Sequence, residues 1–345
     1  MRILIDILHP AHVHFFRNFH DEMVGRGHQL CVTARAKDRS LDLLEQFGLP
    51  YHRLSDQREG GVGMTVEMAQ RTGRLVRLMR RFRPDVMTGI MGPSIAIAGA
   101  LRRVPAVVFY DTEFATQTNR VVYPLAHSVC TPDCYQGKVP GTHLRYAGYH
   151  ELAYLHPNRF RADPAKLGAF GVSADEPYAL VRFVSWQAVH DRRERGLAAA
   201  QKRHLVELLQ GYGRVLVSSE APLPPDLAAL EVNGPVHDIH HLTAHAQLVV
   251  GESATMSSEA AVLGVPAVFI ATTGRGYTDD EEKRYGLVRH FTEEEYDRAL
   301  GTIEELLANS PRDFGRAARE RLLDEKTDVT QWMIDYFEST FSAVT

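Results

Sequence analysis

The chain contains 345 residues, of which 44% are hydrophobic and 24% are charged, and it carries a formal net charge of −4. A chain longer than the roughly 250–300 residues at which single hydrophobic cores usually divide is expected to form two domains. The slightly acidic balance argues against nucleic acid as the main partner, and no apolar run approaches the ~18 residues of a membrane-spanning helix.

The start of the chain and its cysteines favour a cytoplasmic protein. The first residues, MRILIDILHP, enter a strand directly, so no signal peptide is expected. Cys130 and Cys134 lie four positions apart without a second Cys/His pair at zinc spacing. This pattern favours two reduced thiols over a metal site.

Apolar strands alternate with helices over the first 150 residues. Strands are predicted at 3–8, 29–33, 85–90 and 106–110, and helices from Pro10 and at 41–47, 66–83 and 92–101. The helix at 66–83 is basic on one face, for which a solvated surface is the favoured interpretation. That face carries Arg71, Arg74, Arg77, Arg80 and Arg81. The alternation predicts a parallel sheet with ligands at the carboxyl ends of its strands.

A second alternation follows a proline-rich stretch at 146–177 that we interpret as a linker. Strands are predicted at 178–185, 215–218, 248–250 and 267–270, and helices through 209, at 293–307 and, whole or broken, at 314–341. The prediction is an α/β protein with a domain at 1–150, a second domain at 151–312 and a helical tail at 313–345 that packs back on the first domain.

The stretch GESATMSSEAAVLGVP forms the turn and helix of a predicted βαβ unit. A buried strand runs into Gly251, a helix follows that stops at Gly264, and Thr255 is the predicted N-cap. Small residues and free N–H groups at a helix start can receive a diphosphate, although many such turns bind nothing. Glu259, one turn into the helix, either contacts a ligand or merely favours the helix dipole.

Polar groups gather where the first strand meets the first helix. Asp6, His9, His12 and His14 occupy nine residues there, and a general base or a contact to a substrate hydroxyl is expected. His12 and His14 are two positions apart and cannot face one direction on a helix, so one of them is expected to be exposed. A metal would need ligands from elsewhere in the chain.

Two carboxylates follow the strand at 106–110. Asp111 and Glu113 point the same way on an extended segment, so both can line a site. The alternative is that they cap the following helix.

Two further histidine-containing segments carry open alternatives. His190, next to an aspartate in SWQAVHD, is either an oriented imidazole or part of a surface N-cap. A second cluster, in PVHDIHHLTAH, can stack on a nucleotide base, but a solvated loop is favoured. Its members are His237, His240, His241 and His245.

Taken together, these motifs resemble a known family. DILHPAHVHFF, FYDTEFA, YHELAYLHP, SWQAVHD and GESATMSSEAAVLGVP are similar to those of domain of unknown function family 354, within the GT-B nucleotide-sugar proteins, over residues 2–291. More distantly the chain resembles UDP-N-acetylglucosamine 2-epimerases and the lipid II N-acetylglucosaminyltransferase. The resemblance implies a GT-B fold: two Rossmann-like parallel-sheet domains facing across a cleft, with the C-terminal helix returning to the first.

The resemblance also implies site roles. Ser253, Ala254 and Thr255 would contact the diphosphate, and Glu259 would accept hydrogen bonds from the ribose. Ser185, Trp186 and Gln187 would face the same phosphates or the base, although Trp186 by itself is typical of packing.

On the catalytic side, Glu113 stands where the 2-epimerases have a catalytic glutamate. A second catalytic carboxylate of those enzymes falls near Thr116, where this chain has none, and this departure argues against epimerase chemistry.

We therefore expect a cytoplasmic glycosyltransferase that uses a nucleotide sugar, with UDP favoured, to build a glycan or glycoconjugate. His14, or Asp111 and Glu113, would remove the acceptor proton, and His190 is a further catalytic candidate. The acceptor would contact Asp6, His9 and His12. Arg275 or Lys283 would stabilise the leaving diphosphate, with no metal or other cofactor required.

Two other functions remain open: a sugar-nucleotide 2-epimerase and a non-catalytic nucleotide-sugar-binding protein. The expected partners are the donor and a glycan or lipid-linked acceptor, with peripheral membrane contact and a homodimer as further options. An NAD-dependent enzyme is disfavoured because no GxGxxG follows the first strand.

Overall fold

The computed structural model describes residues 1–37, 39–58, 60–184, 196–309 and 311–342. The chain divides into two compact units, the first made of Met1–Arg159 and Lys326–Thr345 and the second of Phe160–Glu325. The sequence places the divisions at 150 and 312 instead. Arg159 donates to Glu22 (2.6 Å) and to Asp328 (2.8 Å), which ties the residues after 150 to the first unit.

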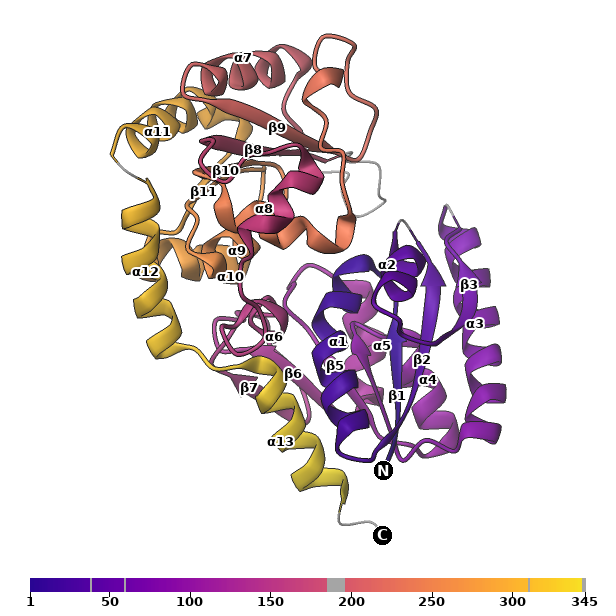
Figure 1. Cartoon of the computed structure of the whole chain (residues 1–345). Coiled ribbons are helices and arrows are strands. Elements are labelled where there is room, and N and C mark those ends of the chain that lie inside the picture. Colours follow the sequence, from indigo (N-terminus) through magenta and orange to yellow (C-terminus); the bar gives the residue numbers. More distant parts are fainter. Residues whose placement is uncertain (38, 59, 185–195, 310, 343–345) are drawn as a thin grey trace. The chain divides into compact units, whose positions relative to one another are not determined.

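The first unit is built on a seven-stranded parallel sheet in the order β3-β2-β1-β4-β5-β6-β7 (Figure 1). Its strands are β1 (Arg2–Ile7), β2 (Gln29–Ala36), β3 (Tyr51–Asp56), β4 (Val86–Ile90), β5 (Ala106–Phe109), β6 (Ser128–Pro132) and β7 (His143–Tyr146). The strand order reverses between β1 and β4. Ligands of such sheets bind outside the carboxyl ends of the strands at this reversal.

Helices cover both faces of this sheet (Figure 1). They are α1 (Pro10–Gly25), α2 (Ser40–Gln46), α3 (Gly61–Phe82), α4 (Pro93–Arg102), α5 (Thr116–Leu125), α6 (Leu152–Leu155) and α13 (Val329–Phe341). On one face Leu4, Met87 and Val108 pack against α3, α4 and α5. On the other, Phe19 of α1 packs on Phe337 of α13 with ring centroids 4.9 Å apart. The end of the chain therefore completes the core of the first unit.

The second unit contains a five-stranded parallel sheet in the order β12-β11-β10-β8-β9. Its strands are β8 (Tyr178–Phe183), β9 (Arg214–Ser219), β10 (Leu248–Gly251), β11 (Ala267–Ile270) and β12 (Val288–Phe291). Its helices are α7 (Ala199–Gln210), α8 (Ile239–His245), α9 (Ala254–Leu263), α10 (Gly276–Asp280), α11 (Tyr296–Ala308) and α12 (Pro311–Glu325). Short helical turns add η1 (Pro164–Phe170), η3 (Ala228–Leu230), η4 (Val236–Asp238), η5 (Glu281–Tyr285) and η6 (Glu293–Glu295). The strand order reverses between β8 and β10.

Most central strands follow the predicted apolar runs, because strands buried on both faces are apolar throughout. Strand β12 and the buried interior strand β6 (SVCTP) were not predicted, and neither were the edge strands β3 and β7. Their sequences, YHRLSD and HLRY, are largely polar, and part of each is accessible. The predicted terminal helix is broken into α12 and α13. Asp328 follows the break and is the N-cap of α13, where its side chain accepts from the N–H of Gln331 (3.1 Å).

Arg71 is buried, so the prediction that it belongs to a solvated face of α3 is wrong. Its guanidinium forms an ion pair with the buried carboxylate of Asp6 and donates to the hydroxyl of Ser55 (3.1 Å). Thr33 donates to the same Asp6 oxygen (2.6 Å). The pair joins α3 to β1, and removing one partner would leave a buried charge uncompensated, which costs about 3–5 kcal/mol.

Within the described part of the chain, no helix has the length and apolar character needed to cross a membrane.

Candidate functional site

A carboxylate and an imidazole form a pair at the carboxyl end of β5. His150 Nδ1 lies 3.1 Å from Asp111 Oδ2, and the Thr112 hydroxyl donates to Asp111 Oδ1 (3.0 Å). Burial raises the pKa of Asp111, but the charge and hydrogen bond of His150 outweigh it and, with Thr112, lower that pKa to about 2. Asp111 is therefore an ionised acceptor at neutral pH, and its side chain remains 22% exposed.

The Asp111 contact orients His150. Because Nδ1–H donates to the carboxylate, the neutral ring presents Nε2 as a proton acceptor. That Nε2 is buried and has no hydrogen-bond partner among the described residues. The ring packs on Phe15, with centroids 4.5 Å apart, and lies parallel to Tyr146. A fixed imidazole with an unpartnered nitrogen has the orientation that a general base requires, and a substrate hydroxyl reaches this nitrogen only when the residues that cover it move.

His12 has the opposite hydrogen-bonding character. Its Nδ1 accepts from the N–H of Leu8 (3.3 Å), so the proton of the neutral ring lies on Nε2. Burial, and then the nearby charges of His9 and His150, lower the pKa of His12 well below its ordinary value, although Asp111 opposes them. His12 is therefore a neutral hydrogen-bond donor at pH 7.

His9 is exposed and caps α1 by accepting from the N–H of Ala11 (3.3 Å). Its ring centroid lies 6.0 Å from that of His12. His14 is buried on another side of α1, against Phe47 (5.6 Å) and Tyr154 (5.4 Å). The prediction that one of His12 and His14 is exposed is therefore wrong, because α1 packs against other elements on both sides.

The two other acids predicted for the first unit have partners of their own. Asp6 is fully buried beside Arg71. Glu113 accepts from the N–H of Gln136 (3.2 Å). Helix α5 has Ala115 at its N-cap and no side-chain cap, so the alternative that Asp111 and Glu113 cap this helix is wrong.

In the second unit, β10 enters α9 through a turn that only glycine accommodates. Gly251 has φ +152°, and a Cβ there would meet the carbonyl oxygen of Arg182 at 2.1 Å. The N-cap of α9 is Ser253, whose Oγ accepts from the N–H of Met256 (3.3 Å). The prediction of Thr255 as the cap is wrong, because the helix begins at Ala254. The first N–H groups of α9 have no acceptor within the helix.

Glu252 holds this turn in place, and the sequence reading did not single it out. Its buried carboxylate accepts from the N–H groups of Val184 (2.9 Å) and Leu197 (2.6 Å) and lies 3.2 Å from Lys202 Nζ. One side chain thus links the ends of β8 and β10 to the segment before α7. A carboxylate directly after a buried strand is the sequence signal that could have identified it.

Glu259 is buried, and its Oε1 lies 2.9 Å from Nε2 of His240, which is also buried. The favoured interpretation of the segment around His240 as a solvated loop is wrong for this residue, which lies on α8. Arg275 donates to the carbonyl oxygens of Thr273 and Gly274, both at 3.0 Å.

Lys283 is exposed. The predicted residues Ser185, Trp186, Gln187 and His190 lie outside the described residues. Across the described ranges, no three His, Cys, Asp or Glu side chains are grouped so as to hold a metal ion.

A family model described as "Protein of unknown function (DUF354)" matches residues 1–182. None of the curated proteins compared with the chain matches it.

Solved structures match over nearly the whole chain. Acinetobacter baumannii MurG has 15% identity and a TM-score of 0.60, covering 99% of this chain and 100% of its own. UDP-GlcNAc 2-epimerase from Neisseria meningitidis, bound to UDP-GlcNAc, has 12% identity and a TM-score of 0.67, covering 97% and 99%. The spinosyn rhamnosyltransferase SpnG, complexed with spinosyn aglycone, has 14% identity and a TM-score of 0.63, covering 98% and 100%. These likenesses confirm the predicted GT-B fold.

Proposed function

The chain belongs to the DUF354 family of proteins of unknown function, and from this premise we propose that it is a glycosyltransferase that takes its sugar from a nucleotide-sugar donor. The observation that carries the proposal is the Asp111–His150 pair, with its bare, buried Nε2 at the carboxyl end of a parallel strand. Transfer of a sugar to a hydroxyl needs a base that removes the hydroxyl proton, whereas binding a nucleotide sugar without turnover needs none.

The donor is assigned to the turn between β10 and α9. Ser253, Ala254 and Thr255 are partly exposed, and the N–H groups at the start of a helix can receive an anion. Glu252 fixes the turn on the sheet through its three contacts. This arrangement suits the diphosphate of a nucleotide sugar, and UDP is the first nucleotide to test.

In the proposed reaction the acceptor hydroxyl gives its proton to Nε2 of His150 while its oxygen bonds to the anomeric carbon. The bond from that carbon to the diphosphate breaks, and its electron pair leaves with the nucleoside diphosphate. Asp111, whose pKa is about 2, stays ionised and stabilises the imidazolium that forms. Neutral His12 can donate from Nε2 to a substrate oxygen.

A sugar-nucleotide 2-epimerase is the second candidate, and the likeness of fold to the Neisseria meningitidis enzyme favours it. Glu113 would then act on the sugar. The position where those enzymes have a second catalytic carboxylate is near Thr116, the first residue of α5, and a hydroxyl there cannot take over acid–base work at neutral pH.

Nucleotide binding is tested first, by thermal unfolding with UDP, TDP, GDP, CMP and their sugars. A ligand at ~100 times its dissociation constant adds about 2.7 kcal/mol of stability. No shift with any nucleotide would remove the basis of the proposal. A shift without turnover of any nucleotide sugar, even with a panel of glycan and glycolipid acceptors, would leave a binding protein.

The chemistry is then followed by NMR of the bound nucleotide sugar with and without acceptors. His150→Gln and Asp111→Asn should each lower transfer about 100-fold or more while keeping the nucleotide-induced thermal shift. His20→Gln is the matched control, because it alters a second histidine–carboxylate pair of the same unit, His20 with Asp21 (2.9 Å), to which no catalytic role is assigned. An epimerised sugar formed without acceptor, with unchanged rates in the two pair variants, would establish the epimerase instead.

A further inference from the structure

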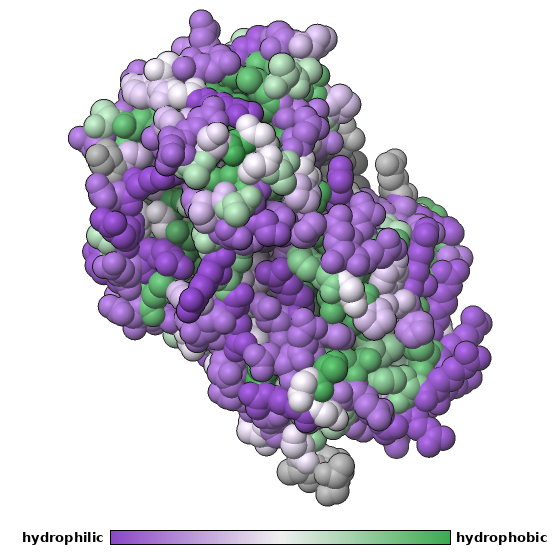
Figure 2. Space-filling model, viewed as in Figure 1, coloured by the Kyte–Doolittle hydropathy of each residue, from purple (hydrophilic) through white to green (hydrophobic). Residues whose placement is uncertain are grey.

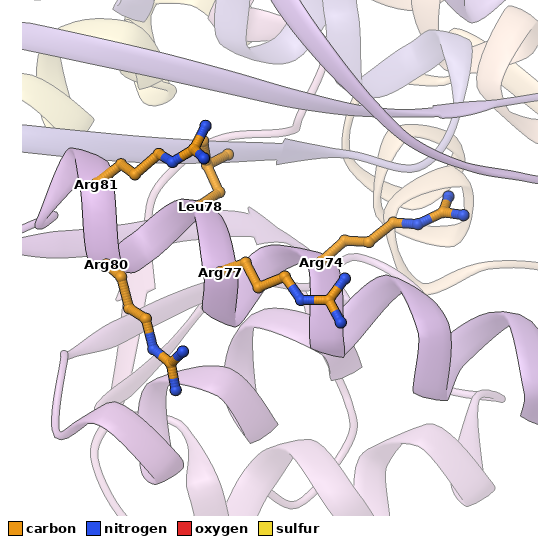
Figure 3. A pocket seen from close by; sticks show the side chains of 5 residues that line it. All are labelled: Arg74, Arg77, Leu78, Arg80 and Arg81. Carbon is orange, nitrogen blue, oxygen red and sulfur yellow. The ribbon is translucent and has the colours of Figure 1, made fainter.

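An arginine-rich surface on the first unit is the strongest feature that the proposed reaction does not use. We define it by the exposed arginines of α3 and α4 and of the residues that follow each helix. They are Arg74, Arg77, Arg80, Arg81, Arg83, Arg102 and Arg103. An open hollow is lined by Arg74, Arg77, Leu78, Arg80 and Arg81, and Arg74 and Arg77 extend along the helix while Arg80 projects away from it (Figure 3).

We propose that this arginine surface binds the face of a membrane that contains anionic lipids. The proposal does not depend on the donor or the reaction. Its first support is charge: the whole chain has a net charge of −4, yet this region is locally basic. The two acids between residues 61 and 103 do not offset it, since Glu67 is buried in contact with Arg35 and Asp85 pairs with Arg2 (3.2 Å).

The arginines of the C-terminal turns of α3 are available to an external anion. Arg77, Arg80 and Arg81 form no hydrogen bond or ion pair with any part of the chain that the structure describes. Arginine binds phosphate oxygens through paired N–H donors, which suits a lipid headgroup. Arg74 donates to the carbonyl oxygen of Leu54, but the three unpaired arginines beside it are better matched to an external polyanion than to internal stability.

Exposed apolar side chains accompany the charges and favour a membrane over a soluble polyanion. Leu101, next to Arg102 and Arg103, is 68% exposed, and Val62 at the start of α3 is 81% exposed. Val66 lies one turn further along α3 and is also exposed. Figure 2 shows hydrophobic atoms beside the strongly hydrophilic side chains in the region of α3.

Helix α3 has 22 residues, about 33 Å of length at 1.5 Å per residue, and its one acidic residue is buried. A helix with apolar and arginine side chains on its outer face, and no accessible acid, can lie in the plane of a bilayer. Leu101 would insert between headgroups while the arginines contact the phosphates.

The test is sedimentation of the full-length protein with vesicles of phosphatidylcholine, with and without phosphatidylglycerol. Binding is expected only with the anionic lipid and should fall as salt is added. Each arginine removed should weaken binding about fivefold, so the combined variant Arg77→Glu, Arg80→Glu, Arg81→Glu should lose it by more than about 100-fold. If the glutamate variant fails to fold, the variant with Gln at the same three positions replaces it. The Gln variant should also weaken vesicle binding, but by less, because it removes the positive charges without adding negative ones.

A matched control reverses three exposed arginines of the second unit: Arg203→Glu, Arg298→Glu and Arg316→Glu. It changes the net charge equally and removes three surface ion pairs, which contribute little to stability, together with the contact of Arg298 with the Phe291 ring. The proposal would be overturned if this control variant lost vesicle binding as fully as the α3 variant does. It would also be overturned if the unmodified protein bound vesicles of pure phosphatidylcholine as well as anionic ones. Tighter binding to RNA or polyphosphate than to vesicles would overturn it too, as would a dimer that the arginine reversal dissociates.

Discussion

The surroundings of three side chains in the segments that follow β1, β5 and β7 give each a different chemical role. Asp111 is held ionised, with its pKa lowered to about 2. His150 is oriented by that carboxylate and presents a bare Nε2. His12 is held neutral by burial and accepts a backbone N–H, which leaves its Nε2 as a donor. Hydrogen bonding and burial, rather than residue type alone, thus decide which side chain acts as the base, which orients the base and which donates a hydrogen bond.

The lowered pKa of His12 predicts a pH dependence of stability. Below pH ~6.5 the unfolded chain binds a proton at this position that the folded chain does not. The free energy of unfolding should therefore fall as the pH drops from 7 toward 5. His12→Gln removes this contribution, so the free energy of unfolding of the variant should change less steeply with pH, by up to about 1.4 kcal/mol per pH unit. Urea unfolding at a series of pH values measures both slopes, and equal slopes would contradict the assignment.

At the scale of elements, helix α9 is positioned by a close backbone contact as well as by its turn. Gly315 of α12 lies against Gly264, which ends α9 in the left-handed conformation at φ +80°. A Cβ at Gly315 would meet the carbonyl oxygen of Gly264 at 2.0 Å. Two glycines from distant parts of the chain therefore allow α12 to pack directly behind the helix assigned to the diphosphate.

This contact predicts opposite results for two Gly→Ala changes in neighbouring helices. Gly315→Ala should destabilise the protein by about 1–3 kcal/mol, because backbone must move to admit the methyl group. Gly301→Ala in α11 meets nothing within 4 Å and should stabilise by about 0.5–1 kcal/mol, since alanine loses less entropy in a helix. Chemical denaturation compares them. A stabilising Gly315→Ala would show that α12 is not held this closely.

At the scale of the whole molecule, the first unit is discontinuous in sequence and the second is continuous. The last segment completes the first unit: Phe337 packs on Phe19, Thr330 donates to the carbonyl oxygen of Ala153 (2.7 Å), and Tyr336 bonds Ser128 (2.8 Å). Met333 is also fully buried. The C-terminal segment is thus a structural part of the domain that carries Asp111 and His150.

Truncation after Glu325 should therefore destabilise the first unit selectively. Losing α13 removes the fully buried Phe337, Met333 and Ile334, whose burial contributes about 1.5–3 kcal/mol for each side chain, and it uncovers Phe19 of α1. Hydrogen exchange should accelerate in β1 and α1 and stay slow in β10 and α9. Equal loss of protection in both units would contradict the division of the chain.

The sequence by itself determined most of the central strands, though not the buried strand β6, and the helix boundaries that depend on local chemistry. Pro10 begins α1, and Gly264 ends α9, because each residue has a restricted or unusual backbone preference that needs no distant partner. The polar edge strands β3 and β7 escaped prediction, since strands that are only partly buried lack a continuous apolar run. The alternation of elements predicted two α/β domains, and the family resemblance implied that they form a GT-B fold.

The tertiary structure alone decided which polar residues belong together. Arg71 was predicted on a solvated face and Asp6 was predicted to contact the acceptor, yet the two neutralise each other in the interior. His150 lay in a quoted motif without an assigned role until the fold placed it 3.1 Å from Asp111. Burial and pairing of a charge depend on which strand and helix ends meet in space. Local sequence patterns carry no information about that meeting, because each side chain is compatible with several partners until the sheets are assembled.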